Sequence, residues 1–344
     1  MDISVALCTF NGEAYLADQL KSIIHQKKKP FEIVICDDGS EDKTNAIIEL
    51  ISEDSSSNIR HFINSRNLHF SGNFFKAASL CSGEYVAFSD QDDLWYRQKL
   101  ERVSEHIRQS SSELLIHRAR LLYSGNNKKF DQRVPDMQKR LYSRKIETCI
   151  QSYALGCCFV VHRKLIDLFP EYWKWDSYLF HRETHGSFIG HDMLLFAACW
   201  SRRSIELIPD TLMDYRIHEK NLFGRHEEET VASSIVKRLS FDPSGASDIL
   251  KSHSERLLSQ YDVLSQIADQ MSGDASQGVL ALAETSKIRG LALLRRAKVR
   301  DASRPRMTRL AELVSGAVSG QYNLGSRYYG ISRLSIFKDL FSLI

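Results

Sequence analysis

The 344-residue chain contains no apolar run close to the ~18 residues of a membrane-spanning helix, so we expect no such helix. Its first residues match a strand rather than a basic segment followed by an apolar one, so we expect no secretory signal. A glycine-rich dinucleotide fingerprint and a phosphate-binding loop ending in Lys-Ser or Lys-Thr are both missing. These absences disfavour a dehydrogenase and a P-loop nucleotidase.

Cysteines are few and are not spaced as ligand pairs. The chain has 7 cysteines, an odd number, and most of them lie inside apolar runs. Cys157 and Cys158 are adjacent, which is poor geometry for two ligands on one metal ion, and no set of four has zinc spacing. We therefore interpret the cysteines as buried free thiols of a protein in a reducing cytoplasm.

Charge is unevenly distributed along the chain. From Glu284 to the C-terminus there are 12 Lys and Arg residues against 4 Asp and Glu, a net charge of +8 within a chain of net charge +3. The remainder therefore carries a net charge of −5. A basic segment of this kind predicts contact with an anionic surface, and we expect a membrane rather than nucleic acid.

Apolar and amphipathic segments alternate through residues 1–90, which predicts an open parallel sheet covered by helices. The expected strands cover residues 3–8, 31–36, 60–63 and 85–89, and the expected helices cover 15–24, 43–51 and 72–81. In the later segments we expect helices over 97–109 and 190–200, strands over 114–123, 154–161, 204–208 and 211–217, and a mobile polar loop over 124–144. Pro209 separates the last two strands.

The C-terminal part has a different composition. A linker at 240–248 precedes segments whose apolar spacing predicts helices over 249–271, 278–300 and 305–318, and a short amphipathic segment covers 331–344. We predict an α/β domain over residues 1–224 and a helical extension over 225–344.

Three carboxylates, Asp90, Asp92 and Asp93, follow the strand expected at 85–89. Carboxylates repel one another, so gathering them is costly unless a cation or solvent takes the charge. A hard divalent metal with positions open to phosphate oxygens is the simplest explanation. The alternative is that Asp93 caps the helix that follows.

Polar residues also follow other strands. Asp37-Asp38-Gly39-Ser40 and Thr9-Phe10-Asn11-Gly12 are typical of nucleotide contacts at the carboxyl edge of a sheet, and equally of turns that cap helices. His191-Asp192 opens an apolar helix, where Asp192 is either a general base or a helix cap. Tyr215-Arg216-Ile217-His218 ends a strand and is either an exposed loop or a group that stabilises a diphosphate.

Taken in order, these motifs resemble family 2 glycosyltransferases of the GT-A fold over about residues 1–224. The Ser89-to-Trp95 motif, with Gly156-Cys157, His191-Asp192 and Tyr215-Arg216-Ile217-His218, is similar to the rhamnosyltransferase-like branch that builds bacterial surface polysaccharides. The resemblance implies an open, mainly parallel sheet flanked by helices. One departure is His117-Arg118-Ala119-Arg120, where relatives commonly carry an acid, and it bears on acceptor contacts.

The resemblance also implies roles for individual residues. Asp192 is the expected catalytic base, and Mg²⁺ or Mn²⁺ is the expected cofactor, held by Asp92, Asp90 and His218. The expected donor-binding residues are Thr9, Asn11, Glu13, Asp38, Asp90 and Arg216.

The expected function is inverting transfer of a sugar, with rhamnose from dTDP-rhamnose favoured, to a surface polysaccharide or lipid-linked glycan. The alternatives are another donor such as a UDP-hexose, or an inactive sugar-nucleotide-binding module. A nucleotidyltransferase is disfavoured because Thr9 to Gln19 contains no Lys or Arg. We expect a cytoplasmic protein that contacts the inner face of the membrane through basic helices, with Arg295, Arg296, Lys298, Arg300, Arg304, Arg306 and Arg309 at the contact.

Overall fold

The computed structural model describes residues 1–123, 129–135, 141–143, 153–169, 190–219 and 246–319, together with Asp339 and Ser342. These residues fall into two compact units. One unit contains the described parts of Met1–Phe180, Ile189–Arg225 and Ile267–Val279. The other contains those of His226–Gln266 and Leu280–Ile344. The division of the chain at residue 224 stays a prediction.

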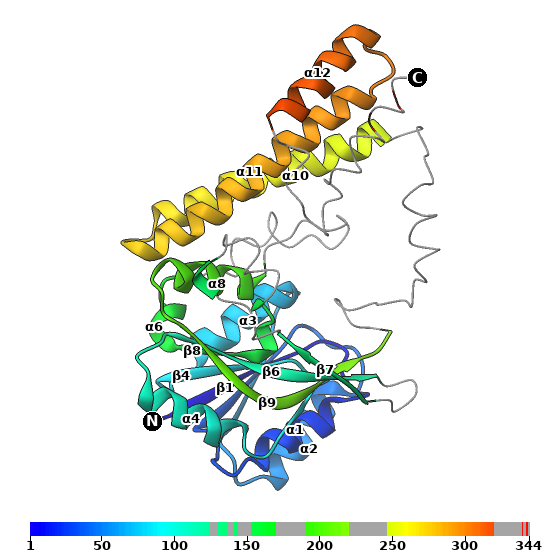
Figure 1. The fold of residues 1–344 in the computed structure, drawn as a ribbon. Helices are drawn as coiled ribbons and strands as arrows, with labels where there is room; N and C mark the ends of the chain where they lie inside the picture. The colour runs from blue at the N-terminus through cyan, green and yellow to red at the C-terminus, as the bar shows by residue number, and fades with distance from the viewer. Residues whose placement is uncertain are drawn as a thin grey trace. The chain divides into compact units, whose positions relative to one another are not determined.

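The strand–helix alternation predicted for residues 1–90 is confirmed (Figure 1). Four strands form a parallel array in the order β3-β2-β1-β4. Right-handed crossovers from β1 to β2 to β3 put α1 and α2 on one face, and the return to β4 puts α3 on the other. The elements are β1 Ile3–Thr9, α1 Leu16–Ile24, β2 Glu32–Asp37, α2 Thr44–Asp54, β3 Ile59–Ile63, α3 His69–Leu80 and β4 Tyr85–Ser89.

The rest of the sheet is mixed. β8 lies between β4 and β6 and is antiparallel to both, and β9 runs parallel to β6. β5 pairs antiparallel with β9, and β7 pairs antiparallel with β6. The elements are β5 Leu94–Trp95, α4 Lys99–Gln109, β6 Leu114–Tyr123, β7 Lys129–Val134, η1 Leu141–Ser143, η2 Gly156–Cys158, β8 Phe159–His162, α6 Arg163–Ile166, α8 His191–Ser201 and β9 Ile205–Ile217.

Two sequence predictions in this half are wrong. The segment predicted as a loop over 124–144 contains β7 and the short helix η1. The two strands expected around Pro209 are one strand, β9. The register explains the second error, because β9 advances from Leu207 to Thr211 while β6 advances only from Ile116 to Arg118. Pro209 therefore lies in a bulge, where no ladder hydrogen bond needs its missing N–H.

The second unit is helical, as predicted. Its helices are α10 Ala246–Asp269, α11 Asp274–Arg300 and α12 Arg306–Val318. The last residues of α10 and the first residues of α11 belong to the first unit. Leu257 of α10 packs on Ala292 and Leu293 of α11. Among the described residues, no helix has both the length and the apolar character needed to cross a bilayer. The prediction for 331–344 falls outside them, apart from Asp339 and Ser342.

Only some of the basic residues that the sequence predicts at the membrane contact are exposed, and the contact itself stays a prediction. Arg296 and Arg309 are each only 6% exposed. The buried Asp339 carboxylate pairs with Arg296 at 2.8 Å and Arg300 at 2.7 Å, and Arg309 Nε donates to the carbonyl oxygen of Val299 at 2.6 Å. These guanidinium groups therefore hold the unit together.

Candidate active site

The loops that follow β1, β2 and β4 meet at one edge of the sheet, because β1 lies between β2 and β4 and all three strands run parallel. Thr9 is beside Asp37 in the register, and Thr9 Oγ1 donates to Asp37 Oδ1 at 2.7 Å. Ser40 N donates to Asp37 Oδ2 at 2.7 Å, so Asp37 closes a turn. The turn interpretation therefore fits Asp37.

Asp38 is held differently. It is 4% exposed, and its Oδ1 accepts from Leu68 N at 2.7 Å and Asn64 Nδ2 at 2.8 Å. These donors lie just before α3, so the carboxylate is fixed by the segment between β3 and α3. Its position at the sheet edge agrees with the one predicted for a donor-binding residue.

Asn11 and Glu13 contact the segment that leads into α2. Glu41 N donates to Asn11 Oδ1 at 2.9 Å, and Lys43 N donates to Glu13 Oε2 at 3.2 Å. Asn11 has a positive φ of 48°, which places it in a tight turn. The structure thus gives both side chains an architectural role, and their contacts with a donor stay a prediction.

Gln91 joins the first and third of these loops, which the sequence does not predict. Its amide Nε2 donates to Phe10 O at 3.0 Å and its Oε1 accepts from Phe10 N at 2.9 Å. The bridge requires glycine at position 12, because a Cβ there would lie 2.2 Å from Gln91 Oε1. In the sequence, Gly12 is the residue that could have indicated this bridge. A glycine alone, however, does not show which side chain occupies the space beside it.

Asp92 and His218 lie together, although 126 residues separate them in the sequence. His218 Nε2 is 2.8 Å from Asp92 Oδ2, and their side chains are only 9% and 16% exposed. The His218 ring stacks on Tyr15 at a centroid distance of 4.6 Å. Arg216 Nε donates to Asp92 O at 2.9 Å, and its guanidinium carbon lies 4.6 Å from the centroid of the Tyr15 ring. The structure therefore brings together three of the predicted site residues.

Asp93 is not the cap of the following helix, so that alternative is wrong. α4 begins only at Lys99, with Gln98 at its N-cap. Asp93 is fully buried, and its Oδ1 accepts from Arg216 N at 3.2 Å. Its Oδ2 is buried without a hydrogen-bond partner.

Asp90 and Asp192 are close enough for their charges to interact. Burial, together with the charges of Asp92 and Asp192, raises the pKa of Asp90 to about 8. Burial raises the pKa of Asp192 to about 6, against the hydrogen bond that Met193 N donates to its Oδ1 at 2.8 Å. At neutral pH Asp192 is thus an ionised carboxylate whose basicity is higher than that of an exposed aspartate.

His191 places Asp192 by packing. Its ring stacks on Phe74 at a centroid distance of 4.4 Å, and burial lowers its pKa to about 3, so it is neutral. A Cβ at Gly156 would lie 2.5 Å from His191 Nε2, and one at Gly190 would lie 2.2 Å from Asp192 Oδ1. Both glycines therefore make room for this pair of side chains at the start of α8.

Lys99 is a buried cation beside the acidic loop, and the sequence does not predict it. Its Nζ lies 3.6 Å from the centroid of the Trp95 ring and donates to Cys157 O at 3.3 Å. Burial lowers its pKa to about 8, against the attraction of Asp93 and Asp90. The acidic loop thus has a cation on its buried side.

The unusual segment at 117–120 is structural in this protein. Arg120 Nε donates to Asp214 Oδ1 at 2.8 Å, and Tyr96 Oη donates to the same oxygen at 2.6 Å. His117 is fully buried, and its Nδ1 lies 3.0 Å from Arg118 O. These contacts give His117 and Arg120 partners within the protein.

Comparisons with known proteins follow the same motifs. Residues 4–169 match the sequence model of glycosyl transferase family 2. An uncharacterized glycosyltransferase of Nostoc sp. is 33% identical over 132 residues, which cover 38% of this chain and 40% of that protein. The dTDP-rhamnosyl transferase RfbG of Shigella flexneri is 27% identical over 227 residues, which cover 63% of this chain and 73% of that protein.

Two further similarities are informative. The Escherichia coli enzyme WfgD, a UDP-Glc:alpha-D-GlcNAc-diphosphoundecaprenol beta-1,3-glucosyltransferase, is 27% identical over 52% of this chain and 67% of its own length. The crystal structure of S. aureus TarS 1-349 has a TM-score of 0.55 at 16% identity, covering 100% of this chain and 90% of that chain. The GT-A type of fold predicted from the sequence is confirmed.

The Gln91 bridge predicts coupling between positions 12 and 91. Gly12→Ala should cost about 1–3 kcal/mol in the free energy of unfolding, because its new methyl group collides with the Gln91 amide. In a Gln91→Ala background the same change should cost about 1 kcal/mol less, since the collision is gone. Denaturant unfolding of the four proteins measures the coupling, and Gly12→Ala with Asp167→Ala is the additive control. Equal costs in both backgrounds would contradict the bridge.

Proposed function

We propose, on the premise that residues 4–169 belong to glycosyl transferase family 2, that the protein is an inverting glycosyltransferase. The observation that carries the proposal is the pairing of two carboxylates at the sheet edge. Asp90 follows β4 beside the loops expected to hold the donor, and Asp192 at the start of α8 lies close enough to raise the pKa of Asp90. A single displacement needs a base for the acceptor hydroxyl and positive charge for the leaving diphosphate, and we assign the first to Asp192 and the second to a metal that Asp90 would help to hold.

Donor binding is proposed for the loops after β1 and β2. Thr9 and Asp38 would contact the base and ribose, supported by their places at the carboxyl edge of the sheet, where such sheets bind ligands. Asn11 and Glu13 would support these loops through their bonds to Glu41 and Lys43.

The donor atoms present fit a divalent metal. Asp92 and His218 offer an oxygen and a nitrogen 2.8 Å apart, both largely buried, and the charge of Asp92 acts on Asp90. Carboxylate oxygen suits Mg²⁺ and Mn²⁺, and an imidazole ligand is better tolerated by Mn²⁺. We assign Asp92, Asp90 and His218 as the residues that would hold this ion, which when bound supplies positive charge beside the diphosphate.

The transfer itself is assigned to Asp192. Its carboxylate accepts the proton of an acceptor hydroxyl as that oxygen bonds to the anomeric carbon, and the bond from this carbon to the diphosphate oxygen breaks. The nucleoside diphosphate leaves with the electron pair of that bond. Arg216, whose guanidinium lies over the ring of Tyr15, would stabilise the leaving charge.

The proposed donor is dTDP-rhamnose, supported by the similarity to RfbG over 63% of the chain. The proposed acceptor is a growing surface polysaccharide or lipid-linked glycan. A UDP-hexose donor is the second candidate, because WfgD is named for transfer of glucose from UDP-Glc to a diphosphoundecaprenol-linked sugar. An inactive sugar-nucleotide-binding module is the third.

Donor hydrolysis distinguishes the three candidates. The purified protein should release nucleoside diphosphate from one member of a panel of dTDP- and UDP-sugars, in Mg²⁺ or Mn²⁺ but not in EDTA. Asp92→Asn should lose this release because it removes a metal ligand, whereas Glu53→Gln on α2 should retain it. Release from a UDP-hexose alone would replace rhamnose as the donor sugar. No release from any donor would overturn the enzymatic proposal, and nucleotide binding without release would identify the inactive binding module.

Asp192→Asn should lower kcat about 10²–10⁴-fold, since it removes a general base, while donor affinity stays unchanged. Asp167→Asn, at an exposed acid after α6, is the matched control. In the wild type, kcat should fall as the pH drops through about 6, because the raised pKa leaves Asp192 protonated below that value. Equal loss of kcat and donor binding in Asp192→Asn would show that the residue only supports the donor.

We also propose that the second unit contacts an anionic membrane through α12, as a cytoplasmic protein peripheral to the inner face. Met307, Val314 and Val318 are 76%, 53% and 84% exposed. With Leu310 they lie on one side of α12, whereas Leu313 and Arg309 are buried on the other. This apolar stripe, in a segment of net charge +8, replaces the arginine cluster as the proposed contact.

Vesicle flotation tests the α12 contact. Wild-type protein should float with vesicles that contain phosphatidylglycerol, and Met307→Gln with Val314→Gln should weaken the binding about tenfold, because two apolar side chains no longer enter the bilayer. Thr308→Gln with Ser315→Gln, exposed positions outside the stripe, is the control and should float like the wild type. Equal flotation of all three proteins would overturn the contact.

A further inference from the structure

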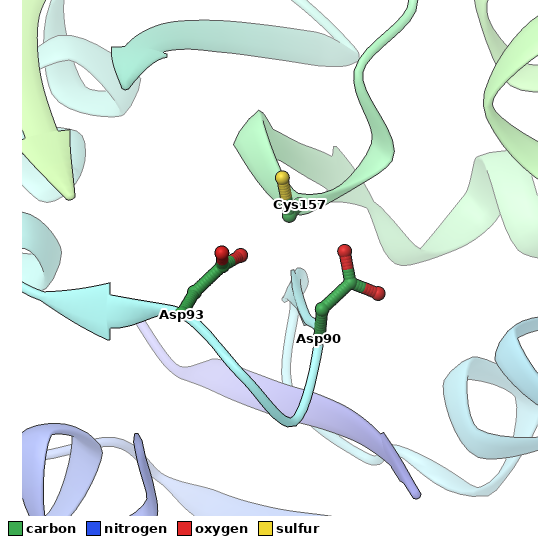
Figure 2. Close-up of side chains that lie close together, drawn as sticks. All are labelled: Asp90, Asp93 and Cys157. Atoms are coloured by element: carbon green, nitrogen blue, oxygen red, sulfur yellow. The ribbon is translucent and has the colours of Figure 1, made fainter. Parts of the chain in front are cut away.

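The acidic loop faces a thiol that the proposed transfer does not use. Asp90 and Asp93 come from the segment between β4 and β5, and Cys157 comes from η2 (Figure 2). One ligand atom from each of these three residues lies within 4.8 Å of the other two. Cys157 is 2% exposed and Asp93 is fully buried. Two carboxylates and a thiol thus lie together, two of the three buried and Asp90 partly exposed.

A second observation marks this position as a place for a ligand. Asp93 Oδ1 is satisfied by Arg216 N, but Asp93 Oδ2 is buried and has no hydrogen-bond partner. Leaving a carboxylate oxygen unpaired in the interior costs free energy. Figure 2 shows the Asp93 carboxylate extended toward the space between Asp90 and Cys157. An ion at that point would satisfy the oxygen.

The donor set selects the kind of ion. A thiolate prefers Zn²⁺ or Cd²⁺ to Mg²⁺, and carboxylate oxygens complete such sites. Bonds of about 2.3 Å to sulfur and about 2.1 Å to oxygen put the ligand atoms of a tetrahedral ion about 3.3–3.8 Å apart. Contraction from a spread of 4.8 Å to this spacing needs only small side-chain rotations. The fourth position would be open to water or to another oxygen ligand.

We propose that Cys157, Asp90 and Asp93 bind one thiophilic divalent cation, Zn²⁺ or Cd²⁺. Binding forms a metal–sulfur bond and releases the thiol proton to solvent. The site is distinct from the pair of Asp92 and His218, although it shares Asp90 with the set proposed for the catalytic metal. If the proposed function holds, an ion here competes with that set for Asp90 and inhibits transfer.

The test is direct binding in the absence of any donor. The wild-type protein should bind one Zn²⁺ per chain by calorimetry, and Cd²⁺ should produce the ultraviolet charge-transfer band of a thiolate–Cd²⁺ bond. Cys157→Ser should remove the band and weaken Zn²⁺ binding at least tenfold. Cys81→Ser, at a buried thiol that donates to Ala77 O instead, is the matched control and should bind as the wild type does.

A second variant keeps the test independent of a folding defect in Cys157→Ser. Asp93→Asn should retain the thiol and the fold, as judged by thermal unfolding, but should also bind Zn²⁺ at least tenfold more weakly. His218→Asn should leave the Cd²⁺ band intact. No Zn²⁺ binding by the wild type would overturn the proposal. So would binding that survives Cys157→Ser but is lost in His218→Asn, since that result places the ion on Asp92 and His218.

Discussion

The structure depends on positive charges that offset the carboxylates at the end of β4. Three carboxylates in four residues, with a fourth from α8, would repel one another strongly in a buried loop. The protein surrounds them with cations that are themselves buried on aromatic rings. Arg216 lies over Tyr15 and Lys99 lies over Trp95. The negative faces of the rings stabilise these charges away from water. Residues from β9 and α4 are therefore part of the acidic site, although neither element follows β4 directly.

The fold can be predicted from the sequence where a local pattern of residues is compatible with only one kind of element. Strands of a parallel sheet are buried on both faces, so β1, β2 and β4 appear as apolar runs that end at polar residues, and amphipathic segments between them can only be covering helices. The pattern fails where pairing decides the structure. Pro209 predicts a break, but β9 accommodates it as a bulge because β6 supplies pairing on both sides. The polar segment of β7 is a strand because it pairs with the end of β6.

The candidate site divides in the same way. Asp92 and Asp192 could be found from sequence, since their motifs place acids at a strand end and at a helix start. Gln91 and Lys99 could not, because each contacts a partner that is distant in the chain and that its own residue type does not identify. Cys157 belongs to the Gly156-Cys157 motif, which does not predict that it faces Asp90 and Asp93. Lys99 in particular looks like any other residue of a helix in the sequence, and only the folded structure shows that it lies beside the acidic loop. Sequence periodicity reports which face of an element is buried and not which charge it meets there.

The position of the proposed base shows how little room this arrangement leaves. The proposed role of Asp192 requires it to lie near Asp90, and any further charged group beside it would shift its basicity. His191 fills that space as a neutral aromatic ring stacked on Phe74, so it excludes water without adding charge. It fits only because the chain has no side chain at Gly156. The glycine and the histidine thus act together, and burial is what raises the pKa of Asp192.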